Sequence, residues 1–276
     1  MTEPFAEYRE IRVTDPLRQG DVLEAVDSGA SAWERHLLVI TADCDFAHDK
    51  HQGRVTCVPL LRADEYLLEL QMPALKEKYI VTKLIPTLRR ALASVAPTVS
   101  DERLRAWPQE ENVDTIIQGL GLTGNSSSEA CAAFHAIRLL GVPCTSLDDA
   151  VLALLEAQLV GPAPKTRDNI LRDITAALKA TYTNPPGDAI FFSAVGHNHD
   201  AGYFAYLRHL EQIWEPEIAI GPTRSEVRYR RISRLRDRYT HATVHRFAPL
   251  YMSIGLPDEY EEARSLHSEL LGEKYK

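Results

Sequence analysis

The chain has 276 residues, of which 45% are hydrophobic and 25% charged, and its formal net charge is −8. These values are typical of a globular protein with a full core, and they argue against a surface that grips nucleic acid over its whole extent. The four cysteines lack the C-x-x-C spacing of a zinc knuckle or redox site, which predicts reduced thiols in a cytoplasmic protein. We expect no secretion signal, because the amino-terminal stretch has no apolar core. No membrane contact is expected either, because no run reaches the ~18 apolar residues of a membrane span.

Three strand-like runs precede a long helical stretch. Apolar runs of strand length occur at 22–26, 37–41 and 55–61, and polar loops separate them. Pro59 lies near the end of the third run, which suits an edge strand or a strand terminus. We therefore expect β-structure in this part of the chain.

Between residues 62 and 182 the apolar period changes from two to about 3.6, which is typical of helices. The expected helices span 65–70, 74–95, 112–120, 130–140, 150–159 and a run from Thr166 or Asp168 to Tyr182. Pro86 predicts a kink or a break in the second of them. The serines at 126–128 suggest an N-cap for the fourth, and Ser146 suggests one for the fifth. The stretch as a whole predicts an all-α unit.

Strand-like patterns return after the helical stretch. Apolar runs at 189–195, 202–207 and 210–214 predict strands, and an arginine-rich stretch at 224–238 leads into an amphipathic helix expected at 240–254. Isolated strands are not stable alone, so the two strand-rich stretches are expected to close into one barrel.

This order of elements predicts four segments. Residues 1–61 form the first part of the β-barrel, and residues 62–182 form a helical insertion. Residues 183–257 form the second part of the barrel with its closing helix, and residues 258–276 form a charged tail. Loop-closure entropy grows slowly with length, so an insertion of this size is tolerable.

Several short segments resemble one family when they are taken in order. Residues 19–23 read Gln-Gly-Asp-Val-Leu, residues 35–40 read Arg-His-Leu-Leu-Val-Ile, and residues 55–60 read Val-Thr-Cys-Val-Pro-Leu. Together with 203–213 and the run from 231 to 256, they resemble the opening and closing segments of MazF/PemK toxins. The resemblance covers under half of the chain. It implies an α+β fold, namely a MazF/PemK-like (SH3-like) antiparallel β-barrel interrupted by an all-α helical insertion.

The resemblance also implies a site for RNA cleavage without a metal, in which an arginine and a threonine or serine help the 2′-hydroxyl attack the neighbouring phosphate. The family's arginine falls on Arg35 here, and its threonine falls on Leu60 or Leu61. A leucine side chain can neither donate nor accept a hydrogen bond, and a general acid or base is worth ~10²–10⁴-fold in rate. We therefore expect the ribonuclease activity to be lost.

An active endoribonuclease is the alternative. In that interpretation Arg35 stabilises the charge on the phosphate, while Thr41, Asp43 or His36 replaces the missing hydroxyl. His36 stands where the family has a proline.

Potential metal ligands are densest in the loop after the second strand, at Asp43, Asp45, His48 and His51. They predict either a divalent-metal or acid–base site on the barrel rim, which His197 and His199 would join, or a polar loop whose aspartates cap backbone N–H groups. We expect the protein to carry no cofactor.

The carboxyl-terminal part of the chain is rich in arginine. Its members are Arg224, Arg228, Arg230, Arg231, Arg234, Arg236, Arg238 and Arg246, and Glu226 and Asp237 are the acidic residues nearby. They predict either a patch that binds the phosphates of RNA or DNA, or ion pairs with the carboxylates of this acidic protein.

The leading expectation is a non-enzymatic regulatory protein whose helical insertion binds a partner protein. By resemblance, such a protein restrains or releases its partner in a bacterial stress or antiviral-defence operon. An RNA- or DNA-binding adaptor is a further alternative. The family is dimeric, so a homodimer is the default unless the insertion blocks the interface.

Overall fold

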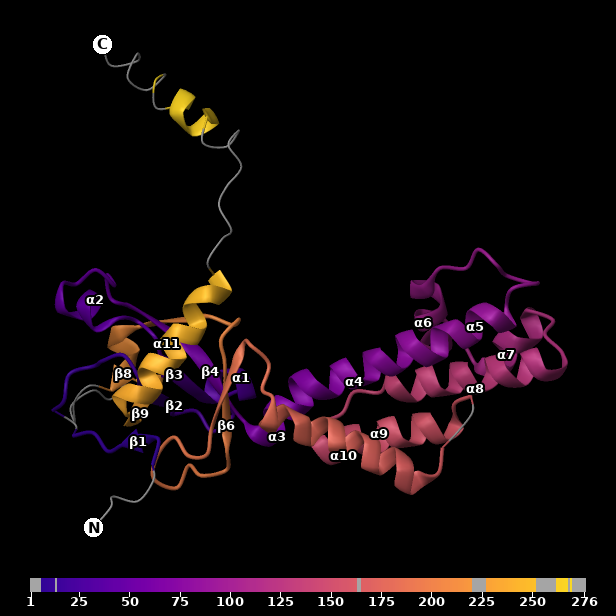
Figure 1. Ribbon diagram of the computed structural model, residues 1–276, viewed down its shortest axis with the longest axis horizontal. Coiled ribbons are helices and arrows are strands. Elements are labelled where there is room, and N and C mark those ends of the chain that lie inside the picture. Colours follow the sequence, from indigo (N-terminus) through magenta and orange to yellow (C-terminus); the bar gives the residue numbers. More distant parts are fainter. Residues whose placement is uncertain are drawn as a thin grey trace.

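Strands from both ends of the chain lie in one sheet, and a helical arm projects from it (Figure 1). The computed structural model describes residues 6–12, 14–162, 165–219, 227–251, 262–267 and 269. The strands are β1 (Tyr8–Arg9), β2 (Asp21–Ala25), β3 (His36–Val39), β4 (Arg54–Arg62), β5 (Ala189–Phe192), β6 (Tyr203–Tyr206), β7 (Glu211–Trp214), β8 (Ile218–Ala219) and β9 (Tyr229–Leu235). Their order is β1-β9-β2-β3-β4-β6-β5, with β7 on β4 and β8 on β9.

The α+β class expected from the sequence is confirmed. The sheet is antiparallel except where β8 runs parallel to β9, and it curls strongly into a half-barrel. Strands before the arm pair with strands after it: β2 pairs with β9, and β4 pairs with both β6 and β7.

The long strand β4 changes partners along its length. Its first half, from Arg54 to Cys57, pairs with β7, and its last part, from Leu60 to Arg62, pairs with β6. Pro59 lies between the two parts and has no N–H to give to a neighbouring strand. The proline therefore stands inside a strand rather than near its end, at the point where the ladder is interrupted and the sheet can bend.

Both faces of the sheet are buried. Val22 and Leu38 belong to a core on one face, and their neighbours Leu23 and Leu37 belong to a core on the other, as the two-residue period of a strand requires. Helix α11 (Asp237–Tyr251) packs on the first face, where Phe247 contacts the core.

The remaining helices divide between the loops of the sheet and the arm. Two short helices, α1 (Ala32–Arg35) and α2 (Asp43–Ala47), lie in loops that the sequence predicted as irregular, and a 3₁₀ turn covers Glu215–Glu217. The arm contains α3 (Ala63–Tyr66), α4 (Met72–Tyr79), α5 (Ile85–Ala91), α6 (Asp101–Glu110), α7 (Val113–Gly119), α8 (Gly124–Leu140), α9 (Leu147–Val160) and α10 (Arg167–Thr183).

The first helical stretch of the arm passes through two prolines. A π-helical turn covers Leu67–Gln71 just before Pro73, and a second covers Ile80–Leu84 just before Pro86. A proline removes one N–H and its ring clashes with the carbonyl four residues earlier, and a wider turn relieves both problems. The chain therefore continues as helix through Pro86 instead of breaking there.

The helix starts differ from prediction in one place and agree in another. Helix α8 begins at Gly124, so the serines at 126–128 lie inside its first turns and do not cap it. Ser146 does cap α9, because its hydroxyl accepts a hydrogen bond from the N–H of Asp149.

The arm has a hydrophobic core of its own. Side chains from α4 to α10 form one buried cluster, in which Leu84, Leu104 and Phe134 are fully buried. No described helix combines the length and the apolar character that crossing a membrane requires.

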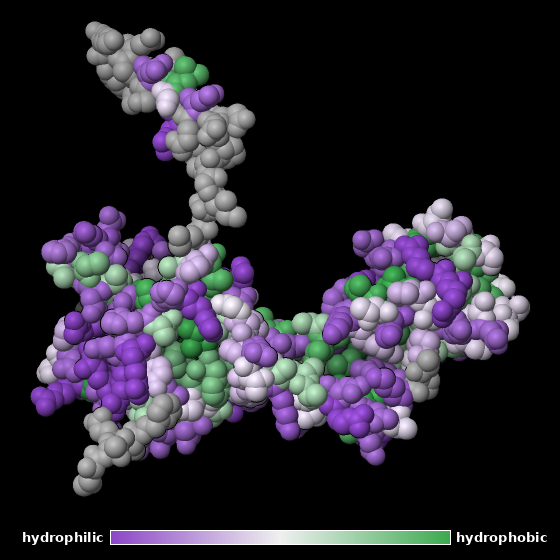
Figure 2. Space-filling model, viewed as in Figure 1, coloured by the Kyte–Doolittle hydropathy of each residue, from purple (hydrophilic) through white to green (hydrophobic). Residues whose placement is uncertain are grey.

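A small aromatic cluster joins the arm to the sheet. Tyr66 of α3 stacks on Phe204 of β6 with ring centroids 4.2 Å apart, and Tyr182 of α10 and Phe191 of β5 contact the same ring. Both chain crossings between sheet and arm therefore pack on Phe204. Apolar residues gather where the arm meets the sheet, whereas the far end of the sheet is mainly hydrophilic (Figure 2).

Replacing Phe204 with alanine should lower the free energy of unfolding by about 3–5 kcal/mol, because a fully buried ring is lost and a cavity remains. The control Leu152→Ala removes a 43% exposed side chain on α9 and should change it by no more than about 0.5 kcal/mol. Urea unfolding followed by circular dichroism measures both. Equal effects of the two substitutions would contradict the role given to Phe204.

Candidate functional site

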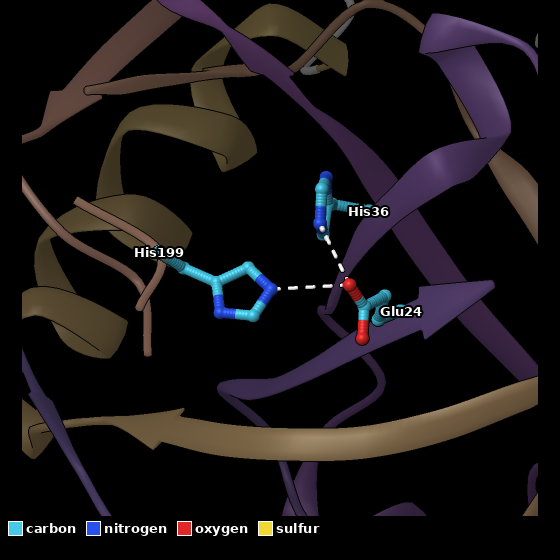
Figure 3. Close-up of side chains that lie close together, drawn as sticks. All are labelled: Glu24, His36 and His199. Atoms are coloured by element: carbon cyan, nitrogen blue, oxygen red, sulfur yellow. Dashed lines mark hydrogen bonds and ion pairs between the residues drawn. The ribbon is translucent and has the colours of Figure 1, made fainter. Parts of the chain in front are cut away.

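Three titratable side chains converge on one face of the sheet (Figure 3). Glu24 on β2 and His36 on β3 are directly opposite each other in the antiparallel register, so their side chains lie on the same face. His199 reaches them from the loop after β5, where a β-bridge with Gly196 fixes its backbone. We call these residues the Glu24 cluster.

Glu24 is the centre of the cluster. Its Oε1 atom lies 3.1 Å from Nε2 of His199 and 3.6 Å from Nε2 of His36. Its Oε2 atom accepts a hydrogen bond of 2.7 Å from Nε of Arg230, which is the register partner of Glu24 on β9. One carboxylate oxygen therefore faces two imidazoles, and the other faces a guanidinium.

The tautomer of His199 follows from its other nitrogen. Nδ1 lies 2.8 Å from the backbone carbonyl oxygen of His197, and a carbonyl oxygen can only accept. Nδ1 therefore carries the proton. In a neutral ring, Nε2 then has a lone pair that points at the carboxylate oxygen of Glu24, which is repulsive unless a cation lies between them.

His36 is buried and without hydrogen bonds. His36 is 4% exposed, and its ring packs edge-on against Tyr203 and His199. Neither of its ring nitrogens has a hydrogen-bond partner. Burial lowers the pKa of His36 to about 4, with His199 adding to the effect. The ring is therefore neutral near pH 7, and each of its nitrogens remains unsatisfied.

Glu24, in contrast to His36, is stabilised in its charged form. Burial raises its pKa, but contacts with His199 and Arg230 outweigh burial, and the pKa lies below its ordinary value. The cluster thus presents one ionised carboxylate and one neutral imidazole, together with His199. Such groups can bind a metal ion or move a proton.

Sequence reasoning missed Glu24 and did not place His36 in a cluster. The three positions lie 12 and 163 residues apart along the chain, so no local spacing reveals them. The available signal was the charged residue inside an apolar strand, together with a histidine at the start of the next strand.

The residues predicted for ribonuclease chemistry make separate contacts. Arg35 forms an ion pair with Glu65 at the start of the arm, Thr41 accepts a 2.7 Å hydrogen bond from the N–H of Thr56, and Asp43 pairs with Arg18 at 3.0 Å. In the part of the chain that the structure describes, no hydrogen bond or ion pair joins Arg35, Thr41 and Asp43 to one another.

The predicted metal ligands in the loop after β3 are also dispersed. His51 contacts Glu215 at 2.9 Å and the carbonyl of Asp45, and the hydrogen bond with Glu215 raises the pKa of His51. Among the described residues, Asp43, Asp45, His48 and His51 are not grouped around a common point, and His199 belongs to the Glu24 cluster instead.

Two arginines of the carboxyl-terminal stretch are buried against one carboxylate. Asp21 is fully buried and pairs with Arg234 at 2.5 Å and with Arg231 at 3.3 Å, and both arginines also donate to the carbonyl of Pro16. These two guanidiniums are used inside the protein, where nucleic acid cannot reach them.

The other arginines of the stretch also have partners in the chain. Arg228 pairs with Glu34 at 2.9 Å, Arg230 pairs with Glu24, and Arg236 donates to the carbonyl of Tyr8. Arg238 lies over the ring of Tyr239, and Arg246 donates to the carbonyl of Ala189. Arg224 lies outside the described residues.

A polar hollow of about 270 Å³ lies beside the buried aspartate. Each of its three arginines has an acidic partner, because Arg18 faces Asp43, Arg9 lies 3.9 Å from Asp237 and Arg234 is held by Asp21. The lining residues are Arg9, Arg18, Gln19, Asp43, Arg234, Asp237, Thr240 and His241. A hollow of this kind has little preference for an anion.

Comparison of the chain with family models, with curated proteins and with solved structures gave no match. What the Glu24 cluster and the arm can do therefore follows from their geometry.

Replacing Asp21 with asparagine should destabilise the protein by about 3–5 kcal/mol, because two buried guanidiniums lose their counter-charge. The control Asp237→Asn changes the same group at a side chain that is 83% exposed, and should cost less than about 1 kcal/mol. Thermal and urea unfolding measure the difference. A mild effect at Asp21 would show that the buried pair contributes little.

Proposed function

We propose that the protein is a non-enzymatic regulatory component that binds a partner protein through its helical arm. The half-barrel would be a divergent MazF/PemK-like, SH3-like barrel reused as a scaffold. In this proposal the protein restrains or releases its partner within a bacterial stress or antiviral-defence operon, as the family resemblance suggests.

The observation that carries the proposal is the independence of the arm. Helices α4 to α10 build their own core and project away from the sheet, to which α3 and the aromatic cluster around Phe204 join them (Figure 1). A helical unit of this kind adds surface at a distance from the barrel, which suits the binding of another protein.

The state of the ribonuclease positions supports a non-enzymatic role. The guanidinium of Arg35 is held by Glu65 in the capping box of α3. Leu60 and Leu61, where the resemblance places a threonine, are both fully buried. The arginines from 228 to 238 that could bind phosphates already contact carboxylates, carbonyls or a ring of this chain.

A groove on the arm has the chemistry of a helix-binding site. It is a hollow of about 210 Å³ between α4, the following π turn, α9 and α10. Leu75, Leu154, Ile174 and Ala177 provide its apolar lining. The exposed lysines of the groove, Lys78 and Lys83, have no ion-pair partner in the described chain, whereas its acidic residue Asp173 is already paired with Lys165 at 2.7 Å.

The free charge of the groove is therefore positive. We propose that the groove binds an amphipathic helix of a different protein. This helix would place an apolar stripe on the groove and carboxylates beside the two lysines.

Purified full-length protein should not cleave single-stranded RNA. A fluorescent RNA incubated with the protein in EDTA, at low and moderate salt, measures this. Metal-independent cleavage that Arg35→Ala abolishes would contradict the non-enzymatic role and would favour the ribonuclease alternative.

Partner binding should depend on the two groove lysines. The double variant Lys78→Glu/Lys83→Glu should weaken binding of the partner captured from the native host roughly tenfold, and binding should fall with salt. The control Lys50→Glu/Lys179→Glu makes the same charge change at exposed residues outside the groove and should leave the affinity unchanged.

Titration of the identified partner and cross-linking mapped by mass spectrometry provide the measurements. Equal losses for the two double variants, or cross-links confined to the sheet, would overturn the proposal. A dimer mass in light scattering that the variant Lys78→Glu/Lys83→Glu reduces to a monomer mass would show that the groove binds a second copy of this chain instead.

A further inference from the structure

We propose that Glu24, His36 and His199 bind one first-row divalent transition-metal ion, for which Zn²⁺ is the probe. The proposal is independent of partner binding by the arm. It rests on the donor set, the spacing of the donor atoms, the unsatisfied nitrogens and the groups that hold the ligands in place.

The donor set suits such an ion. Two imidazoles and one carboxylate are a common combination for Zn²⁺ and Fe²⁺, and a set of three leaves further positions for water or another ligand. Glu24, His36 and His199 each offer one ligand atom, and all three atoms lie within 4.8 Å of one another.

The spacing around Oε1 of Glu24 is close to that of coordination, and the 3.1 Å contact with His199 fits a hydrogen bond equally well. Bonds of about 2.0–2.2 Å to one ion place neighbouring ligand atoms roughly 3–3.5 Å apart. The distances from Oε1 of Glu24 are 3.1 Å to His199 and 3.6 Å to His36, and the second is too long for a hydrogen bond.

The nitrogens of the cluster offer lone pairs that a positive species beside Glu24 would satisfy. The Nε2 lone pair of His199 points at the carboxylate, because the proton of that ring lies on Nδ1. His36 is more than nine-tenths buried, and both of its nitrogens lack a hydrogen-bond partner. A proton on His199 would satisfy one of these atoms, whereas a metal ion would satisfy Nε2 of both rings and Oε1 together.

The surrounding contacts are those that support metal ligands. His199 donates its other ring N–H to the carbonyl of His197, and Arg230 binds the carboxylate oxygen of Glu24 that faces away from the imidazoles. Contacts of this kind fix the orientation of ligating side chains. Glu24 and His36 are cross-strand partners, so their backbones hold the spacing.

The site is accessible to an ion. The side chains of Glu24 and His199 are each 18% exposed, and the side chain of Arg230 is 63% exposed. An ion can therefore enter from the side of His199, while His36 closes the inner side.

A second group of possible ligands must be separated in the test. Asp114, Cys131 and His135 also lie within reach of one another, on helices α7 and α8 of the arm. Asp114 is exposed, and none of these three side chains is a buried polar group without a partner. The variant His135→Ala removes one ligand of this second group, so any binding that it abolishes belongs to the arm and not to the Glu24 cluster.

The experiment is a Zn²⁺ titration of EDTA-stripped, full-length protein against a chromophoric chelator near pH 7.5. The expected result is one ion per chain, with an affinity that falls at least about a hundredfold in Glu24→Gln and in His199→Ala. His51→Ala, which removes another histidine that contacts a glutamate, and His135→Ala should bind as the unmodified chain does.

Two further readouts separate binding from folding. Zn²⁺ should raise the melting temperature of the unmodified chain but not of Glu24→Gln, whose metal-free circular dichroism spectrum should remain native. Co²⁺ should give ligand-field absorption bands that disappear in His199→Ala and persist in His51→Ala.

Three results would overturn the proposal. The first is the absence of stoichiometric binding, and the second is binding that only His135→Ala removes. The third is nitrogen-15 NMR that finds His199 doubly protonated near pH 7.5 with Zn²⁺ present, because a proton would then occupy the position assigned to the ion.

Discussion

The fold depends on a buried carboxylate that joins the two ends of the chain. Asp21 on β2 holds Arg231 and Arg234 on β9, more than two hundred residues away, and none of the three is left with an exposed charge. Buried charges destabilise a protein unless they are paired completely, so this contact tolerates one alignment of the strands. The helical arm is inserted between β4 and β5, and the contact between β2 and β9 forms around it.

The pairing of β2 with β9 also positions the Glu24 cluster. With β2 and β9 in register, Glu24 lies opposite Arg230, and the pairing of β2 with β3 places His36 on its other side. A shift of one residue would move Glu24 to the opposite face of the sheet and separate it from both. The buried pair at Asp21 and the cluster therefore lie on the same two strands, on either side of a β-bulge that shifts the register by one residue between Val22 and Leu23.

Much of the architecture could be predicted from the sequence, because apolar periods of two and of 3.6 mark strands and helices directly. The strands around Leu38 and Phe204 and the helix around Ile170 lie where these periods placed them. The cluster could not be predicted, since its members meet only through the register of β2 and β3 and through a bridged loop. The continuation of the helix through Pro86 also escaped prediction, because the π turn that relieves the proline has no pattern of its own.

In this acidic chain the fold places carboxylates beside the arginine-rich stretch. In sequence these arginines have few acidic neighbours, yet in the fold Asp21, Glu24 and Glu34 lie beside them. Arg231 and Arg234 are buried in ion pairs with Asp21, whereas Arg228 and Arg230 pair with carboxylates while staying more than half exposed.

Arg35 illustrates the same point at the root of the arm, where its guanidinium holds Glu65 while its neighbour His36 faces the cluster. Anchoring of the arm and alignment of the proposed ligands thus begin at two consecutive residues. Arg35, a candidate catalytic residue from the sequence, contacts the first helix of the arm in the structure.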